Sequence, residues 1–244
     1  MVTPTTPVSR APSTPKGQRT RAEILAAGGR VFAKAGYITL RMGDVAAEAG
    51  VSMGALYRYF RNKDDLFLSL IGDIHNELFE ASQARGRNFQ SETYAALREA
   101  NAGYLAHYHA NRDVMRAFVE ATTVNSRYRD TWWRMRQRHI DRFVAVLNRE
   151  FGMTAIAGMD VRRVTEALAS LTEQSAYVWF AQQSLNTSPI EVETAAEIIT
   201  RAWFAAFFTG GPAQGADDGS RTAGTDPEDR PADSGPEQNP TLPV

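Results

Sequence analysis

A glycine turn between two short helical stretches, at residues 44–60, limits what the N-terminal part of this chain can fold into. Apolar residues recur at helical spacing before Gly50 and again after it, where Leu56 and Phe60 stand one turn apart. Glycine readily adopts the left-handed backbone conformation that a tight turn between two helices requires. We therefore predict a helix–turn–helix whose second helix is anchored in the core by Leu56 and Phe60.

Helical spacing of apolar residues continues on both sides of this motif, up to residue 209. The first helix is expected to start within residues 16–20, where Thr20 and Glu23 fit a capping box, and to stop at Gly36. Asn62 and Asp65 are expected to cap a fourth helix. Longer helices are expected at residues 91–109, 111–124, 126–151, 160–186 and 189–209. No strand-like alternation is found, so the predicted fold class is all-α.

Composition and helix caps predict the domain boundaries. The Pro/Thr/Ser-rich start and the Gly/Asp/Pro-rich end of the chain have compositions typical of disordered segments. The last helix is expected to begin with Ser188 as N-cap, Pro189 at the first helical position and Glu191 completing the box, and to end at Gly210. The expected parts are an N-terminal arm (1–15), a three-helix domain (16–62), a larger helical domain (63–209) and an acidic tail (210–244).

The distribution of charge favours a nucleic acid as partner of the N-terminal part. The formal net charge is only −1. Residues 1–65, however, carry ten Lys and Arg against five Asp and Glu, whereas residues 211–244 carry two against seven. A polyanion responds to the local field within a Debye length rather than to the total charge. The basic front of the chain is therefore compatible with DNA.

The second helix of the motif has the composition of a recognition helix. Small residues at its front would let its backbone approach the major groove of a duplex. Tyr57, Tyr59 and Lys63 could pair with phosphates, which sets the register on the duplex rather than selecting the sequence. The alternative is a helical hairpin in an ordinary bundle, with tyrosines that only reach solvent. The candidate DNA-binding residues are Arg41, Ser52, Met53, Gly54, Ala55, Tyr57, Arg58, Tyr59 and Lys63.

Residues 16–66 resemble the DNA-binding domain of TetR-family regulators. The run from Gly50 to Phe60, followed by Asn62 and Lys63, carries that family's most specific motif. The resemblance implies a three-helix DNA-binding unit, a helical ligand-binding domain and dimerisation through the last two long helices. Gly43 departs from the pattern, because many members have a polar or basic residue near the start of the second helix. Arg41 is expected to substitute for it.

Residues 91–209 resemble the ligand domain of the ethionamide-resistance repressor group. The match rests on residues 111–114, Trp132, residues 171–174 with Tyr177, and Trp203. In that group such positions line a long apolar channel. The lining residues that the resemblance implies here are Tyr104, Tyr108, Trp132, Thr172, Glu173, Tyr177 and Trp203. His139 and Thr172 differ from the tryptophan and the amide that would suit the channel, and imply a shorter or more polar pocket.

The residues themselves are compatible with such a pocket. Tyr104 and Tyr108 share one helix face, and Thr172, Glu173 and Gln174 make a polar break in an apolar helix. Ligand pockets combine aromatic walls with a few polar groups, and a buried carboxylate needs a partner. The alternative is ordinary core packing, with Glu173 directed to water or to a neighbouring arginine.

The last two helices are apolar almost all round. One apolar stripe packs inward, and a second stripe has to be buried elsewhere. A two-fold bundle between two copies of the chain meets that need, and burial inside a monomer is the alternative. The candidate dimer-interface residues are Ala176, Phe180, Ile199 and Phe207.

Several functional classes lack support in the sequence. The chain has no cysteine, which excludes disulfides and thiolate chemistry. His75, His107, His109 and His139 do not form a metal-ligand set, and no catalytic grouping or phosphate loop is found, so we expect no enzyme, metal or cofactor. The arginines of residues 126–142 are interpreted as a solvated face, and an anionic or acyl-CoA-like ligand is the alternative.

The expected function is a homodimeric repressor that a lipophilic small molecule releases from its operator DNA. The alternatives are an effector-independent DNA-binding protein, a ligand-dependent activator of the same fold, and an all-α enzyme that carries a helix–turn–helix. No apolar stretch is long enough to span a bilayer, and the N-terminus lacks the apolar core of a secretory signal. The expected location is therefore the cytoplasm, without membrane association.

Overall fold

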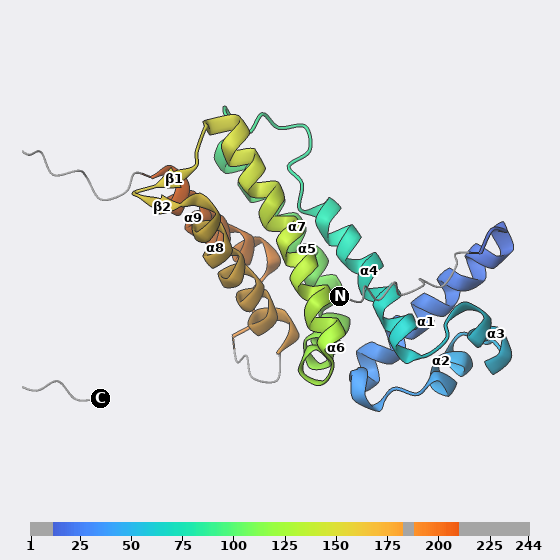
Figure 1. Cartoon of the computed structure of the whole chain (residues 1–244). Coiled ribbons are helices and arrows are strands. Elements are labelled where there is room, and N and C mark those ends of the chain that lie inside the picture. Colours follow the sequence, from blue (N-terminus) through green and yellow to red (C-terminus); the bar gives the residue numbers. More distant parts are fainter. Residues whose placement is uncertain (1–11, 183–187, 210–244) are drawn as a thin grey trace, which may run out of the picture. The chain divides into compact units, whose positions relative to one another are not determined.

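The structure is a computed structural model that describes residues 12–182 and 188–209 (Figure 1). The helices are α1 (Pro15–Thr39), α2 (Met42–Glu48), α3 (Met53–Tyr59), α4 (Lys63–Ala81), α5 (Thr93–Ala110), α6 (Arg112–Val124), α7 (Ser126–Phe151), α8 (Val161–Ala176) and α9 (Val192–Phe208). A π-helical turn, Tyr177–Ala181, continues α8. The predicted all-α class is confirmed. One small ribbon was not predicted: β1 (Ala155–Ile156) pairs antiparallel with β2 (Met159–Asp160) between α7 and α8.

The first helix is longer at both ends than the sequence pattern predicts. Thr14 is the N-cap, its Oγ1 accepts a hydrogen bond from the Gly17 amide at 3.1 Å, and Pro15 takes the first helical position. Proline suits that position because its missing N–H would have no partner inside the helix. The predicted cap at Thr20 is therefore wrong, and its hydroxyl donates to a carbonyl one turn back. Gly36 (φ +74°) interrupts the helix, which continues to residue 39.

The helix–turn–helix has the predicted geometry. Gly50, with φ of +64°, lies in the turn between α2 and α3. Ser52 caps α3, and its Oγ accepts a hydrogen bond from the Ala55 amide at 3.2 Å. Leu56 and Phe60 are fully buried. Burial of Leu56 and Phe60 fixes the orientation of α3, and with it the direction in which the exposed residues of α3 point.

The start of the last helix differs from the prediction. Helix α9 begins at Val192, after Glu191, which has an extended backbone and makes no side-chain capping bond. Ser188 and Pro189 precede the helix, so the predicted capping box does not form. Residues 183–187, at the predicted end of the preceding helix, lie outside the described residues. The same holds for most of the predicted arm and for the predicted tail from Gly210 onward.

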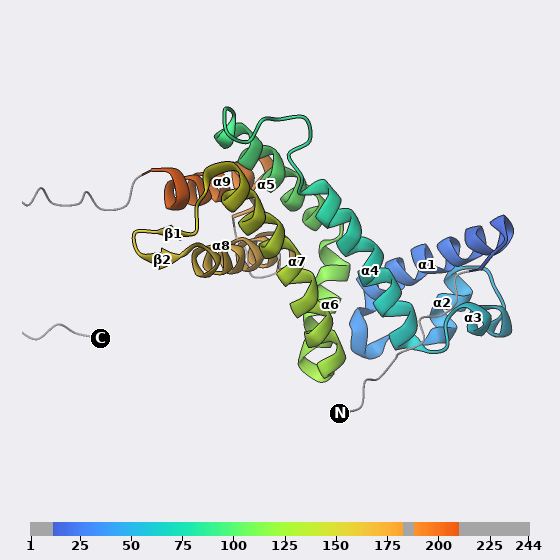
Figure 2. The same ribbon diagram turned by 45° about the horizontal axis from the view of Figure 1, so that its top comes forward.

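Helix α4 packs against two different parts of the unit. Its N-cap is Asn62, whose Oδ1 accepts from the Asp65 amide at 2.9 Å, as predicted. Near its start, Leu66 packs closely on α1, where a Cβ in place of the Gly28 hydrogen would lie 3.3 Å from Leu66 Cδ2. Farther along, α4 contacts α5 and α7. Figures 1 and 2 show α4 between α1 and these two helices.

Five buried aromatic rings, here called the junction cluster, connect the first helix to the C-terminal helices. Phe67 of α4 is at the centre, 4.2 Å from Phe32 and 5.2 Å from Tyr37 of α1, between ring centroids. On its other side it lies 6.3 Å from Phe118 of α6 and 5.5 Å from Tyr128 of α7. Tilted and edge-on pairs at these separations add to the gain from burying apolar surface.

The Asp64 carboxylate binds the hydroxyl groups of two rings of the junction cluster. Asp64 Oδ1 accepts hydrogen bonds from the Tyr37 hydroxyl at 2.6 Å and from the Tyr128 hydroxyl at 3.0 Å. Burial raises the pKa of both phenols, so both stay protonated and remain donors at neutral pH. One side chain in the first turn of α4 therefore joins α1 to α7.

We expect Phe67→Ala to lower the free energy of unfolding by about 3–5 kcal/mol, because it removes the central ring of the junction cluster and leaves a cavity. Tyr57→Ala, which removes an exposed ring of α3, is the matched control and should change the free energy of unfolding by less than about 0.5 kcal/mol. Urea unfolding followed by circular dichroism measures both. Equal effects of the two substitutions would show that the cluster does not stabilise the fold.

Candidate functional site

The outward surface of α2 and α3 holds the residues predicted to contact DNA. Arg41, Ser52, Met53, Gly54, Tyr57 and Arg58 are exposed, and Ala55, Tyr59 and Lys63 are half-buried. Gly54 has no side chain and leaves the start of α3 open. Apart from the adjacent residues and the backbone of the same helix, no atom lies within 4 Å of where a Cβ at this position would be. The geometry is that of a helix whose N-terminal end could enter a groove.

Lys63 has a structural partner that the sequence did not indicate. Its Nζ donates to the backbone carbonyls of Tyr37 at 2.9 Å and Ile38 at 3.3 Å, and it lies 4.5 Å from the centre of the Tyr37 ring. These contacts hold the end of α1 against the start of α4. One of the three ammonium hydrogens is left for an external anion, so a phosphate contact by Lys63 stays a prediction.

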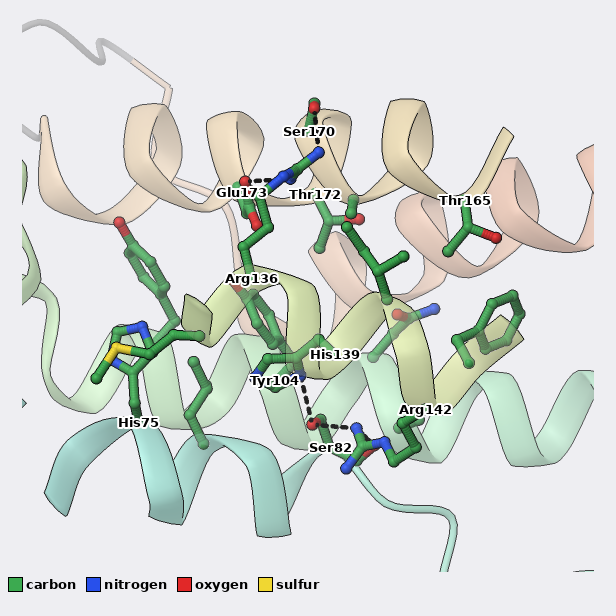
Figure 3. A pocket seen from close by; sticks show the side chains of 18 of the residues that line it. His75, Ser82, Tyr104, Arg136, His139, Arg142, Thr165, Ser170, Thr172 and Glu173 are labelled. Carbon is green, nitrogen blue, oxygen red and sulfur yellow. Dashed lines mark hydrogen bonds and ion pairs between the residues drawn. The ribbon is translucent and has the colours of Figure 1, made fainter. Parts of the chain in front are cut away.

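A cavity of about 1310 Å³ lies among helices α4 to α9 (Figure 3). All seven residues expected from the sequence line it: Tyr104, Tyr108, Trp132, Thr172, Glu173, Tyr177 and Trp203. Other lining residues that the sequence did not single out include His75, Met115, Phe118, Arg136, Arg142 and Phe143. Whether a ligand binds these residues stays a prediction.

Several aromatic side chains line the cavity, among aliphatic, polar and charged ones. Tyr104 and Tyr108 stack one turn apart on α5, with ring centroids at 6.3 Å, and Trp203 meets Phe143 edge-on at 4.8 Å. The Trp203 Nε1–H donates to Thr172 Oγ1 at 2.9 Å, and that hydroxyl donates in turn to the Leu168 carbonyl. Thr172 thus has a donor and an acceptor within the protein, and the tryptophan ring is held against the wall.

An ion pair between a buried arginine and a half-buried carboxylate crosses one wall. Arg136 Nη1 donates to Glu173 Oε2 at 2.8 Å, while Nη2 donates to Ser170 Oγ at 2.8 Å and to the Glu166 carbonyl at 2.6 Å. Burial raises the pKa of Glu173, and the Arg136 guanidinium opposes that shift. The interpretation of the arginines of α7 as a solvated face is wrong for Arg136, which is buried. Its partner Glu173 lies on α8, and the sequence around Arg136 does not indicate that contact.

Two histidines in the cavity wall are neutral at pH 7. Burial lowers the pKa of His75 to about 4, and burial with the nearby Arg142 charge lowers that of His139 to about 3. His75 Nδ1 is buried without a hydrogen-bond partner. The spacing of residues in the sequence places His75 on the apolar face of α4, but it does not indicate that the ring nitrogen lacks a hydrogen-bond partner there. Among the described residues, no group of three or more His, Asp or Glu could hold a metal ion.

The four residues predicted for a dimer interface face the inside of the chain instead. Ala176, Phe180, Ile199 and Phe207 are 0%, 2%, 1% and 6% exposed, so they form the core, and the monomeric alternative holds for them. The outward stripe of the same helices carries other apolar side chains. The large ones are Leu171, Val178 and Ile198, which are 45%, 44% and 47% exposed. The sequence could not distinguish the inward stripe from the outward one because both are apolar.

Two protein families match the chain in sequence. Residues 24–70 match "Bacterial regulatory proteins, tetR family", and residues 97–209 match "Transcriptional regulator EthR, C-terminal domain". The regulator TtgR of Pseudomonas putida is 40% identical over 60 residues, which is 25% of this chain and 29% of TtgR. EthR of Mycolicibacterium smegmatis is 23% identical over 145 residues, 59% of this chain and 67% of EthR. The chain thus matches less than a third of the length of TtgR.

Solved structures of similar fold include those of transcriptional regulators. NalD, described as the secondary repressor of the MexAB-OprM multidrug efflux pump in Pseudomonas aeruginosa, has a TM-score of 0.60 and 22% identity over 78% of this chain and 96% of NalD. A TetR-family regulator from Rhodococcus sp. has a TM-score of 0.60 and 20% identity, covering 77% and 98% of the two chains. These likenesses show a shared fold. In the described part of this chain, no helix is long and apolar enough to cross a membrane.

A double-mutant cycle should reveal the ion pair in the cavity wall. We expect Arg136→Met alone to lower the free energy of unfolding by about 2–3 kcal/mol, because the half-buried Glu173 carboxylate loses its partner. The double variant Arg136→Met, Glu173→Met should recover most of that loss. Urea unfolding measures both. Arg163→Met, which removes a largely exposed partner of Glu166, is the control and should cost less than about 1 kcal/mol. Simple additivity of the two substitutions would contradict a coupled pair.

Proposed function

Because this chain belongs to the TetR family of bacterial regulatory proteins, with a C-terminal domain of the EthR type, we propose that it is a sequence-specific DNA-binding transcriptional regulator. It acts in the cytoplasm as a dimer, and it represses transcription until a lipophilic small molecule fills its cavity. One observation carries the proposal: α4 connects the exposed helix–turn–helix to a cavity of about 1310 Å³ that several aromatic rings line. The matched families consist of transcriptional regulators, which also favours a non-enzymatic function for this chain.

The DNA-binding face supports the first part of the proposal. The start of α3 presents Gly54 and Ala55 with little side chain, followed one turn later by Tyr57 and Arg58. Small residues allow the helix end to approach base edges, while Arg58 and the tyrosine hydroxyl lie where phosphates or bases could accept hydrogen bonds. Arg41, at the N-cap of α2, adds a charge beside them.

The junction cluster offers a route from the cavity to the DNA-binding helices. Phe118 lines the cavity and contacts Phe67 and Tyr128, which in turn contact Tyr37 of α1. Beside it, Glu120 Oε2 accepts from the Tyr37 amide at 3.1 Å. A ligand that displaces Phe118 would shift α6 and α4, and α1 with them. A difference of about 2–3 kcal/mol between the two arrangements would lower operator affinity by one to two decades.

The exposed stripe of α8 and α9 supports a dimer. Leu171, Val178 and Ile198 are large apolar side chains that the monomer leaves open to solvent. An isologous contact of this stripe with its copy would bury them, and it would place two recognition helices to meet major grooves about 34–36 Å apart.

Arg58→Ala should weaken binding to a duplex that the wild-type protein selects from a random library. If Arg58 contacts a phosphate, the slope of log affinity against log salt should fall in magnitude by about 1; a base contact would instead cost roughly 1–3 kcal/mol at one position. Arg163→Ala on α8, which removes another exposed charge, should change neither quantity. Fluorescence anisotropy over a salt series measures both. Failure of the wild-type protein to select any duplex would sink the proposed function.

Leu171→Glu should convert the dimer into a monomer, because a charge would then be buried at the two-fold contact. Operator affinity should drop with it, since one recognition helix alone contacts one half-site. Val124→Glu, at an exposed apolar residue of α6 outside the stripe, is the control and should remain dimeric. Light scattering at micromolar concentration is the measurement. A dimeric Leu171→Glu protein would place the interface elsewhere.

A further inference from the structure

We propose that the effector is an amphipathic organic acid whose carboxylate binds Arg142, in the corner of the cavity between α4 and α7. The inference rests on the proposed function, because it takes the cavity to hold the effector, and it adds the chemical class of that molecule. Figure 3 shows Arg142 beside Ser82 and His139 in this corner, at a distance from His75 along the cavity.

Arg142 is held in place by the end of α4. Its Nη1 donates to the Phe79 carbonyl at 2.6 Å, and its Nη2 donates to the Ser82 carbonyl at 2.8 Å and to Ser82 Oγ at 2.7 Å. These bonds use three of the five N–H donors of the guanidinium. The group is therefore pre-oriented, and donors remain for a ligand.

The other arginines of the cavity wall are either paired with carboxylates or exposed to solvent. Among the five that line it, three are paired with carboxylates: Arg136 with Glu173, Arg87 with Glu92 and Glu99, and Arg149 with Glu150. A fourth, Arg129, is exposed to solvent. Arg142 is half-buried and forms no ion pair within the described part of the chain. The Glu80 carboxylate, which acts on it from a distance, is bonded to Arg85 at 2.6 Å.

The electrostatics of this corner favour an anion. Burial lowers the pKa of Arg142 to about 10, which shows that its charge is held in a poorly solvated place. His139 is neutral at pH 7, because its pKa is lowered to about 3, so it neither repels nor compensates the charge of Arg142. A carboxylate would restore the lost solvation through charge-assisted hydrogen bonds. The apolar body of the acid would lie along Tyr104, Phe143 and Trp203, which line the same cavity.

A purely structural role is the competing explanation, because Arg142 also caps α4, and the experiment separates the two. Arg142→Gln is compared with Arg138→Gln. Both guanidiniums stack on Phe79, at 4.0 and 3.7 Å from the ring centre, but Arg138 bonds Asn76 and does not line the cavity. The probes are matched acids and alcohols: dodecanoic acid with dodecanol, and phenylalkanoic acids with phenylalkanols of equal length. Quenching of tryptophan fluorescence reports binding, since Trp132 and Trp203 line the cavity.

For wild type and Arg138→Gln, we expect at least one acid to bind about tenfold more tightly than its alcohol. Arg142→Gln should lose that preference and keep the affinity for the alcohol. Three results would overturn the proposal: equal binding of acids and alcohols by wild type, a preference that survives in Arg142→Gln, or no binding of any acid. Loss of acid and alcohol binding together in a folded Arg142→Gln protein would assign Arg142 to structure alone. Should that variant not fold, Arg142→Lys must retain the preference.

Adding the same compounds to the complex with the selected duplex separates this inference from the proposed function. If alcohols release the duplex as well as acids do, the regulator function stands and the preference for an acid falls. If no duplex is bound at all, the proposed function falls, and the fluorescence comparison still decides whether the cavity prefers an acid.

Discussion

Helix α4 packs against α1 near its start and against the cavity-lining helices farther along, and much of the remaining arrangement follows from this double contact. Near its start, Leu66 and Phe67 fill the space left by α1, where Gly28 allows a close approach. Near its end, His75 and Leu78 form part of the cavity wall. A rigid helix that satisfies both neighbours cannot adjust to one without disturbing the other, because packed interiors transmit small displacements. The connection between cavity and recognition helix is therefore a property of packing.

The features that could be predicted from the sequence depend on local patterns or on the family resemblance. Gly50, Leu56 and Phe60 specify the helix–turn–helix through spacing and backbone freedom, which neighbours in sequence decide. The resemblance placed Tyr104 and Trp203 at the cavity, where both are found. The path of the helices determines which aromatic residues face the cavity, and a family resemblance carries that path over.

The features that could not be predicted depend on partners far away in the sequence. Arg136 is buried because Glu173 and Ser170, on another helix, accept its hydrogen bonds, and nothing near Arg136 indicates this. The inward stripe of α8 and α9 could not be told from the outward one, since both are apolar; Ile199 is buried and its neighbour Ile198 is exposed. The start of α9 was misplaced for a different reason: residues 188–191 satisfy a capping pattern, but the backbone of Glu191 is extended and the helix begins only at Val192.

The junction cluster also determines how separable the two functions are. Three of its five rings, Phe67, Phe118 and Tyr128, belong to helices beyond the helix–turn–helix. Phe67 contacts both Phe32 and Tyr37 of α1, and Tyr128 contacts Tyr37. Residues 12–62 cut out alone would leave those two rings without their partners. A chimaera that grafts this DNA-binding part onto another effector domain must therefore import matching aromatic partners. The DNA-binding helices and the cavity would be inherited together, as one linked trait.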